Sequence, residues 1–168
     1  PLFIFAGALL SEGGVAKNLM DLASATIGRG RGGLGVSVIG STMVFSGISG
    51  SSSADTAAIS KVSNPSLKEQ GYPAPFRASL LASAGCAGTL IPPTNDLILI
   101  GIVGNISIAG LFAAGILPAI VNGLGLMAWV VYVSRRNGYG NVSIPFSLKA
   151  VFRSFIKASP AILLIVII

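Results

Sequence analysis

The sequence predicts an all-α, polytopic membrane protein, and three observations lead to this fold class. Of its 168 residues, 52% are hydrophobic and only 10% are charged, and the mean hydropathy is +0.84, a balance unlike that of a soluble domain. The 22 glycines lie mostly inside apolar stretches, where small residues let membrane helices approach one another closely. Lysine and arginine are confined to short segments between apolar ones, as in loops that join membrane helices.

The charged and reactive residues exclude several other classes of protein. The net charge of +6 is carried by these short segments, so it predicts orientation in a lipid bilayer and not a nucleic-acid-binding surface. The chain has no histidine and one cysteine, which leaves it without an internal disulfide, a histidine zinc ligand or a histidine base. We therefore expect no cofactor.

Both ends of the chain are predicted to belong to membrane helices. Residues 1–10 are apolar and lack the basic lead and cleavage site of a secretory signal, so we expect them to end one helix. Residues 159–168 are too few to provide the roughly 20 residues of a spanning helix, so we expect them to begin another. Because the sequence also starts without methionine, we expect it to be a fragment of a longer protein.

Two further segments combine charged and apolar side chains at helical spacing. In residues 11–32 charged residues are mixed with Val, Leu, Met and Ile at roughly helical spacing, which predicts an amphipathic interfacial helix. In residues 144–158 phenylalanines lie close to Lys149, Arg153 and Lys157. This second segment predicts an amphipathic helix on the cytoplasmic surface.

Three apolar segments lie between them. The first, residues 33–60, is interrupted at its middle by the polar string GISGSSSAD, and the charged linker KVSNPSLKEQGYPAPFR follows it. The second, residues 76–104, is interrupted by GTLIPPTND, whose two prolines remove backbone donors and force the helix to unwind. The third, residues 109–133, is uninterrupted and predicts a transmembrane helix.

The basic residues distinguish two topologies. If all three apolar segments cross the membrane, the basic residues of the linker lie opposite Arg29 and Arg31, against the positive-inside bias. If residues 33–60 instead enter and return as a re-entrant helical hairpin, every basic residue faces the cytoplasm. Non-helical backbone at membrane depth is tolerated where it is packed in protein or faces a water-filled cavity. The sequence therefore predicts a re-entrant hairpin followed by a broken transmembrane helix.

The two interruptions are candidates for the functional site. Glycines at the hairpin tip leave carbonyl groups exposed, and serine oxygens are hard ligands that suit a small cation; a serine-rich loop or close helix packing is the alternative. Paired broken segments near the membrane midplane hold substrate or coupling ion in transporters; a simple proline kink is the alternative. The residues expected to line a substrate site are Ser53, Asp55, Thr94, Asn95 and Asp96.

Asp55 and Asp96 are the only acids within the apolar segments. Because an ionised carboxylate is costly to bury in a membrane, such acids usually have a partner or a function. Two roles are open for Asp55: it caps the second helix of the hairpin, or it contacts a ligand directly.

Six strings, in order along the chain, resemble the large membrane subunit M of tripartite ATP-independent periplasmic (TRAP) transporters, the DctM-like family. They cover nearly all of the chain and read PLFIFAGALLSEGG, RGGLGVSVIGSTMVFSGISGSSSAD, KEQGYPAPFRASLLASAG, GTLIPPT, SIAGLFAAGILPAIVNGLGLM and RRNGYG. The resemblance implies the ion-transporter superfamily architecture, in which two inverted repeats each contribute a helical hairpin and a broken helix to a mobile transport domain. This chain would hold the first repeat.

The resemblance also implies a sodium site between the hairpin tip and the unwound helix. Its ligands would be the hydroxyls of two serines and three backbone carbonyls, at Ser49, Ser51, Gly88, Ile91 and Pro93. The family commonly follows its double proline with Ser, an apolar residue and another proline, whereas this chain continues with TND. The substrate class therefore stays open at this point.

For function, the resemblance implies the permease of a secondary, sodium-coupled importer of organic acids, such as a C4-dicarboxylate, a sialic acid or a keto acid. The resemblance further implies that such a permease would work by an elevator mechanism in the bacterial inner membrane. Its partners would be a small Q membrane subunit and a periplasmic substrate-binding protein, P.

Two other functions are the alternatives. The string GISG, residues 47–50, fits the G-x-S-G nucleophile string of rhomboid-type intramembrane serine proteases. A serine nucleophile needs a base beside it, and this chain has no histidine. A structural or channel role in the membrane is the third interpretation.

Overall fold

The computed structural model describes residues 13–28, 30–140, 151–152, 154–156 and 158–159. The predicted membrane helix ends at 1–10 and 160–168, and residues 144–150 of the predicted surface helix, lie outside the described residues. The described residues form helices and no strand, which confirms the all-α class for this part of the chain. The helices are α2 (Val15–Ile27), α3 (Gly33–Ser49), α4 (Ser52–Glu69), α5 (Ala74–Gly88), α6 (Asn95–Gly104) and α7 (Ile108–Asn137).

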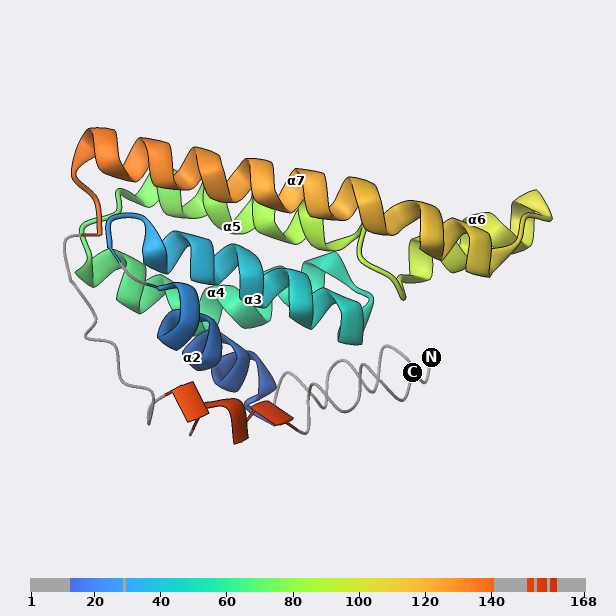
Figure 1. Cartoon of the computed structure of the whole chain (residues 1–168), viewed down its shortest axis with the longest axis horizontal. Coiled ribbons are helices and arrows are strands. Elements are labelled where there is room, and N and C mark those ends of the chain that lie inside the picture. Colours follow the sequence, from blue (N-terminus) through green and yellow to red (C-terminus); the bar gives the residue numbers. More distant parts are fainter. Residues whose placement is uncertain (1–12, 29, 141–150, 153, 157, 160–168) are drawn as a thin grey trace.

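Helix α3 lies at the centre of the bundle. It contacts α2, α4, α5 and α7, and α7 runs beside α5 along the length of the molecule (Figure 1). Val38, Ile39 and Phe45 of α3 are fully buried, and Ile59 and Leu67 of α4 belong to the same core. A helix that is apolar and buried on most sides is typical of a bundle interior.

A short turn joins α3 and α4 into a helical hairpin. Gly50 adopts the left-handed conformation, with φ of 63°, and its N–H donates to the carbonyl of Ser46 at 2.9 Å. Glycine takes this conformation without a steric penalty and so ends the helix. The predicted polar loop over residues 47–55 is therefore wrong except for Gly50 and Ser51, because the flanking residues are helical.

Helix α4 continues to Glu69, past residue 60, where the sequence predicts the end of the hairpin. Ile59, Ser63 and Leu67 are completely buried, and their spacing of four places them on one face of the helix. This buried face extends the helix through most of the predicted charged linker. The linker is thereby corrected to residues 70–73.

Residues 89–94 separate α5 from α6. They include Pro92 and Pro93, which are joined by a cis peptide bond and have no N–H to donate. The Oγ1 atom of Thr94 accepts a hydrogen bond from the N–H of Leu97 at 3.4 Å and caps the start of α6. That these two helices cross a membrane stays a prediction.

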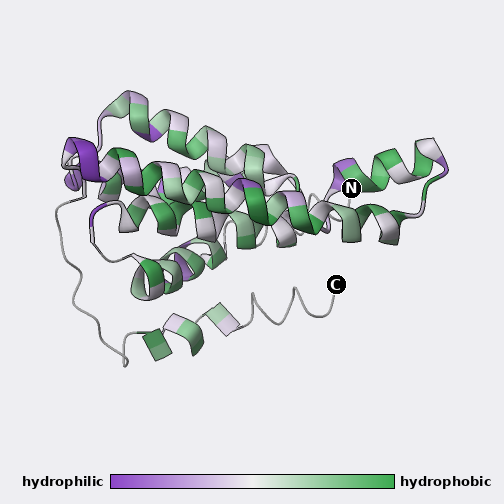
Figure 2. Ribbon diagram, turned by 45° about the horizontal axis from the view of Figure 1, so that its top comes forward, coloured by the Kyte–Doolittle hydropathy of each residue, from purple (hydrophilic) through white to green (hydrophobic). Residues whose placement is uncertain are grey.

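Of the described helices, α7 alone is long and apolar enough to cross a membrane, and it contains the predicted span at 109–133. Helix α6 and the N-terminal part of α7 form an arm that projects beyond the other helices (Figure 1). Hydrophobic residues dominate this arm, as the colouring of the ribbon shows (Figure 2). The side chains of Val103, Leu117 and Val121 are among the exposed ones. Apolar surface of this kind is typical of a site that contacts lipid or further protein.

Aromatic rings pack together at the other end of the bundle, where α4, α5 and the C-terminus of α7 meet. The ring of Tyr72 lies 5.7 Å from that of Phe76 and 5.6 Å from that of Tyr139. The hydroxyl of Ser134 donates to the Tyr72 hydroxyl at 3.4 Å. Burial raises the pKa of the Tyr72 phenol above its ordinary value, because the charged form is poorly solvated there. These contacts hold the turn between α4 and α5 against the end of α7.

Candidate functional site

The hairpin tip lies against the interruption, the segment of residues 89–94 between α5 and α6 (Figure 1). The side-chain amide of Asn95 donates to the carbonyl of Gly50 at 3.3 Å. A Cβ added at Gly47 would lie 3.4 Å from the side chain of Ile91 and 3.6 Å from the carbonyl oxygen of Pro92. The two polar strings, which are distant in sequence, therefore form one local site.

Asp55 accepts the hydrogen bonds at the centre of this site. Its side chain is 0% exposed, whereas aspartates are rarely buried without partners. Ser46 donates to its Oδ2 atom at 2.5 Å, and Ser49 donates to its Oδ1 atom. Both carboxylate oxygens thus accept hydroxyls from α3, and they tie the two helices of the hairpin together.

The capping role that the sequence leaves open for Asp55 is wrong. Helix α4 begins at Ser52, and Ser51 is its N-cap residue, with an extended backbone. Asp55 therefore lies inside the first turn, where its backbone N–H donates to the carbonyl of Ser51 at 2.9 Å. Its carboxylate faces α3 instead of the helix end.

The two serines predicted to bind sodium are neighbours in this arrangement. Ser49 is 1% exposed, and its Oγ atom accepts a hydrogen bond from the backbone N–H of Ser51 at 3.2 Å. The hydroxyl of Ser51 lies 3.5 Å from that of Ser53 at the rim of the tip. Ser53, a predicted substrate-site residue, is exposed and lies outside the buried network.

The interruption supplies backbone oxygens. Because Pro92 has no N–H, the carbonyl of Gly88 instead accepts a hydrogen bond from the N–H of Ile91 at 3.0 Å. No described residue donates to the carbonyl oxygens of Ile91 and Pro93. A Cβ added at Gly88 would overlap the hydroxyl of Ser46, so the predicted carbonyl ligands start directly beside the network of Asp55.

The three residues after the double proline have different surroundings. Thr94 is 2% exposed and caps α6, and Asn95 reaches the hairpin tip. Asp96 is exposed in the first turn of α6, where the helix dipole favours a carboxylate. Asn95 thus contacts the hairpin tip, Thr94 is buried at the cap of α6, and Asp96 lies apart from the buried network; that these residues line a substrate site stays a prediction.

Ser46 is the member of the network that the sequence pattern does not reveal. It precedes Ser49 by three residues, a spacing that places both hydroxyls on one face of α3. Elsewhere on this helix buried serines donate to the carbonyl four residues earlier: Ser37 to Gly33 at 2.9 Å and Ser41 to Ser37 at 2.7 Å. Ser46 and Ser49 depart from this pattern because the carboxylate on α4 is the stronger acceptor.

The oxygen atoms at the site are ligands that fit a hard cation such as sodium. They are hydroxyl, carboxylate and carbonyl oxygens, which hard cations prefer over nitrogen or sulfur ligands. Within the described ranges, no group of three or more His, Cys, Asp or Glu side chains gathers to hold a metal ion. The predicted sodium ligands are neutral oxygens, and the buried carboxylate of Asp55 lies beside them and binds the hydroxyl of Ser49.

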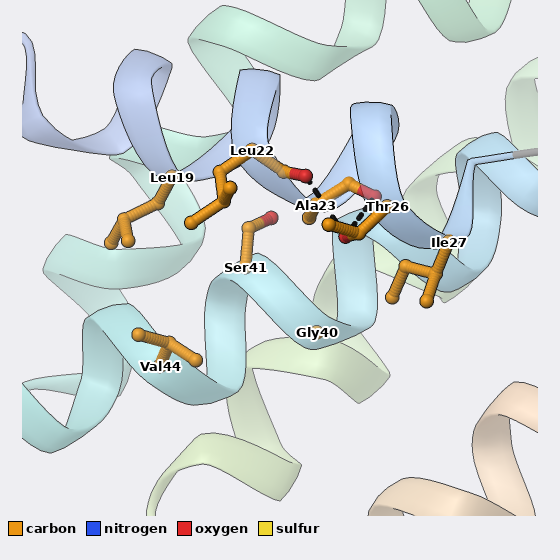
Figure 3. A pocket seen from close by; sticks show the side chains of 8 residues that line it. All are labelled: Leu19, Leu22, Ala23, Thr26, Ile27, Gly40, Ser41 and Val44. Carbon is orange, nitrogen blue, oxygen red and sulfur yellow. Dashed lines mark hydrogen bonds between the residues drawn. The ribbon is translucent and has the colours of Figure 1, made fainter. Parts of the chain in front are cut away.

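An apolar cleft between α2 and α3 differs in chemistry from this site (Figure 3). It has a volume of about 420 Å³, and Leu19, Leu22 and Val44 are among the side chains that line it. The hydroxyls of Thr26 and Ser41 in its wall already donate to backbone carbonyls. The cleft is therefore a poor candidate for binding an organic acid.

Comparison with known proteins decides the family. The profile described as "Tripartite ATP-independent periplasmic transporter, DctM component" matches residues 1–168. The chain belongs to this DctM family. It is 36% identical over 168 residues to the isethionate TRAP transporter permease protein DctMQ of Oleidesulfovibrio alaskensis, and it covers 26% of that protein.

Two further DctM relatives match the whole chain. It is 36% identical to the C4-dicarboxylate TRAP transporter large permease protein DctM of Pseudomonas aeruginosa. It is 35% identical to the 2,3-diketo-L-gulonate TRAP transporter large permease protein YiaN of Escherichia coli. The chain spans 39% of the length of each of these two proteins.

The family assignment also decides against the enzyme interpretation. DctM proteins are components of transporters and not enzymes, so the rhomboid-type protease interpretation of Ser49 is wrong. In the structure the Ser49 hydroxyl donates to a carboxylate that also binds Ser46. The predicted resemblance to the large TRAP subunit is confirmed.

Proposed function

We propose that this chain is part of the large permease of a sodium-coupled, binding-protein-dependent importer of organic acids in the bacterial inner membrane. Its proposed partners are a small membrane subunit Q and a periplasmic substrate-binding protein P, in keeping with a tripartite family. Relatives are named for isethionate, for C4-dicarboxylates and for 2,3-diketo-L-gulonate. The proposed substrate is therefore a small organic acid of a class that this chain alone does not distinguish.

The contact between the hairpin tip and the interruption carries this proposal. Ser49 contributes a buried hydroxyl from one segment, and Gly88 and Ile91 contribute carbonyls from the other. The segments touch through the hydrogen bond from Asn95 to Gly50. An ion that binds oxygens of both segments would stabilise their contact.

The proposed mechanism is an elevator. Sodium binding holds the hairpin and the broken helix together, and both move across the membrane with the substrate. Each sodium ion that enters gains about 2.3 kcal/mol per 100 mV of membrane potential, which offsets the uphill movement of an organic anion. A cleft of about 400 Å³ between α3, the interruption and α7 lies beside the proposed ion site.

Replacing the two tip hydroxyls tests the sodium coupling. Ser49→Ala and Ser51→Ala each remove one proposed ligand with little change in volume. We expect the sodium affinity to fall roughly 5- to 150-fold, as for a lost buried polar contact of about 1–3 kcal/mol. The measurement is substrate uptake against external sodium, in proteoliposomes that contain the complete transporter and its binding protein.

The control is Ser53→Ala, which removes an exposed hydroxyl of the same tip and should change the sodium dependence less. Wild-type sodium dependence in both test variants would remove Ser49 and Ser51 from the site. Uptake by the wild-type transporter that is independent of sodium would refute the coupling itself. Flux far above the turnover of a carrier would favour a channel instead.

A further inference from the structure

We propose that Asp55 and Ser46 are positioning residues of the sodium site. Together they orient the Ser49 hydroxyl so that its oxygen, and not its hydrogen, faces the ion. The inference rests on the proposed function, because it assumes that sodium binds at the hairpin tip.

The hydrogen-bonding capacity of the Ser49 hydroxyl is almost fully used. A serine hydroxyl has one hydrogen to donate and two lone pairs to accept with. The hydrogen is donated to Asp55, and one lone pair accepts the backbone N–H of Ser51 at 3.2 Å. One lone pair remains, and a cation ligand needs only that.

Ser46 fixes the carboxylate that sets this orientation. It donates to Oδ2 of Asp55 at 2.5 Å, while Ser49 donates to Oδ1. Ser46 is 1% exposed and packs so closely against Gly88 that a Cβ there would overlap its hydroxyl. Rotation of the carboxylate would leave buried hydroxyls unpaired, which is unfavourable. The orientation of Ser49 therefore depends on Asp55 and, through it, on Ser46.

In the part of the chain that the structure describes, the side-chain partners of Asp55 are the neutral hydroxyls of Ser46 and Ser49, and no cationic group contacts it. Helix α3 contains no charged residue. On α5 the guanidinium of Arg77 binds Asn64 and the carbonyl of Tyr72 at the other end of the helix. A buried carboxylate without a countercharge is unfavourable, and a sodium ion held by Ser49 would offset its charge.

Asp55→Asn is the main test variant, because it keeps the shape of the side chain and replaces one acceptor by a donor. The amide N–H2 group then donates to a serine oxygen and occupies a lone pair, or the hydrogen of Ser49 turns toward the ion. We expect the sodium affinity to weaken roughly 10- to 100-fold, as for a lost charge-assisted hydrogen bond.

Ser46→Ala is the second variant, and it keeps the proposed ligand and the carboxylate. We expect it to weaken sodium binding roughly 3- to 10-fold, because it removes one neutral donor. The matched control is Ser37→Ala. Ser37 is an equally buried serine of α3 that donates to the carbonyl of Gly33, so this variant should retain the wild-type sodium affinity.

Two measurements on the complete transporter distinguish positioning from a structural role. A positioning role raises the half-saturating sodium concentration for uptake while the maximal rate at saturating sodium is retained. A merely structural role lowers the maximal rate and the yield of folded protein and leaves half-saturation unchanged. Binding of radioactive sodium to the purified complete permease gives the affinity without transport, and Ser46→Ala decides the matter if Asp55→Asn does not fold.

The outcomes separate this inference from the proposed function. Higher half-saturation in Asp55→Asn and Ser46→Ala, with Ser37→Ala unchanged, supports the positioning role. Wild-type sodium affinity in both test variants overturns that role and leaves the sodium coupling intact. If the wild-type permease itself binds no sodium, the coupling and the positioning role fail together.

Discussion

At the residue scale, the close approach of α5 to α3 and α4 depends on two positions without a side chain. A Cβ at Gly88 would overlap the hydroxyl of Ser46, and one at Gly85 would overlap the hydroxyl of Thr56. Both glycines are buried near the end of α5. Their absence of a side chain lets the interruption reach the hairpin tip, so these glycines connect the packing of the helices to the proposed ion site.

The first prediction concerns Gly88. Gly88→Ala forces Ser46 out of its place between Gly88 and Asp55, so we expect it to destabilise the fold by about 1–3 kcal/mol, as overpacking does. Gly125→Ala is the control, because a Cβ there meets no atom within 4 Å and alanine is the better helix former. Thermal unfolding of the purified complete permease checks this, and equal melting temperatures for the two variants would contradict it.

The sequence reveals Ser49 and Asp55 because polar residues are conspicuous in apolar segments. It does not reveal that Asp55 binds Ser46, since that contact depends on where α4 begins. The left-handed Gly50 starts α4 at Ser52 and thereby turns the carboxylate toward α3. A shift of the helix start by one residue would rotate Asp55 by about 100° around the helix axis.

At the element scale, the short helix α6 depends on its cap and its contact with α7. It has 10 residues, whereas isolated helices below roughly 12–15 residues are marginal even with good sequences. The double proline predicts that the helix expected over residues 76–104 is interrupted near residue 92, because prolines have no backbone N–H to donate in a hydrogen bond. The charged residues after residue 60 suggest that α4 ends there, but the helix continues. Ser63 and Leu67 are buried and extend its buried face between charged neighbours.

The second prediction concerns the cap of α6. Thr94→Ala removes the oxygen that accepts the N–H of Leu97, and we expect it to destabilise the protein by about 1 kcal/mol. Thr94→Ser keeps the accepting oxygen and should reduce the stability much less than Thr94→Ala does. Hydrogen exchange of the α6 amides in the complete permease measures the effect locally. Equal protection in the two variants would show that packing against α7, and not the cap, holds α6.

At the scale of the whole molecule, a cluster of basic residues and an exposed apolar surface lie at opposite ends. Arg135 and Arg136 end α7, Lys68 ends α4, and Arg77 lies in the first turn of α5. Tyr72 contacts Tyr139 and Ser134, so these ends meet in one place, where hydrophilic residues gather (Figure 2). The other end is the apolar arm of α6 and α7. This polarity favours the topology in which the basic end faces the cytoplasm.

The last prediction tests this topology with single cysteines in the complete permease, after Cys86, which is exposed, is replaced by alanine. Arg31 precedes α3 and Lys68 ends α4, and both are exposed. If α3 and α4 form a re-entrant hairpin, cysteines at both positions react with a membrane-impermeant reagent from the cytoplasmic side only. A cysteine at Ser107, in the uncharged turn between α6 and α7, reacts from the periplasmic side. Labelling of positions 31 and 68 from opposite sides would mean that the hairpin crosses the membrane, because the chain between them would then connect two compartments. The sodium site would then need a different location relative to the bilayer.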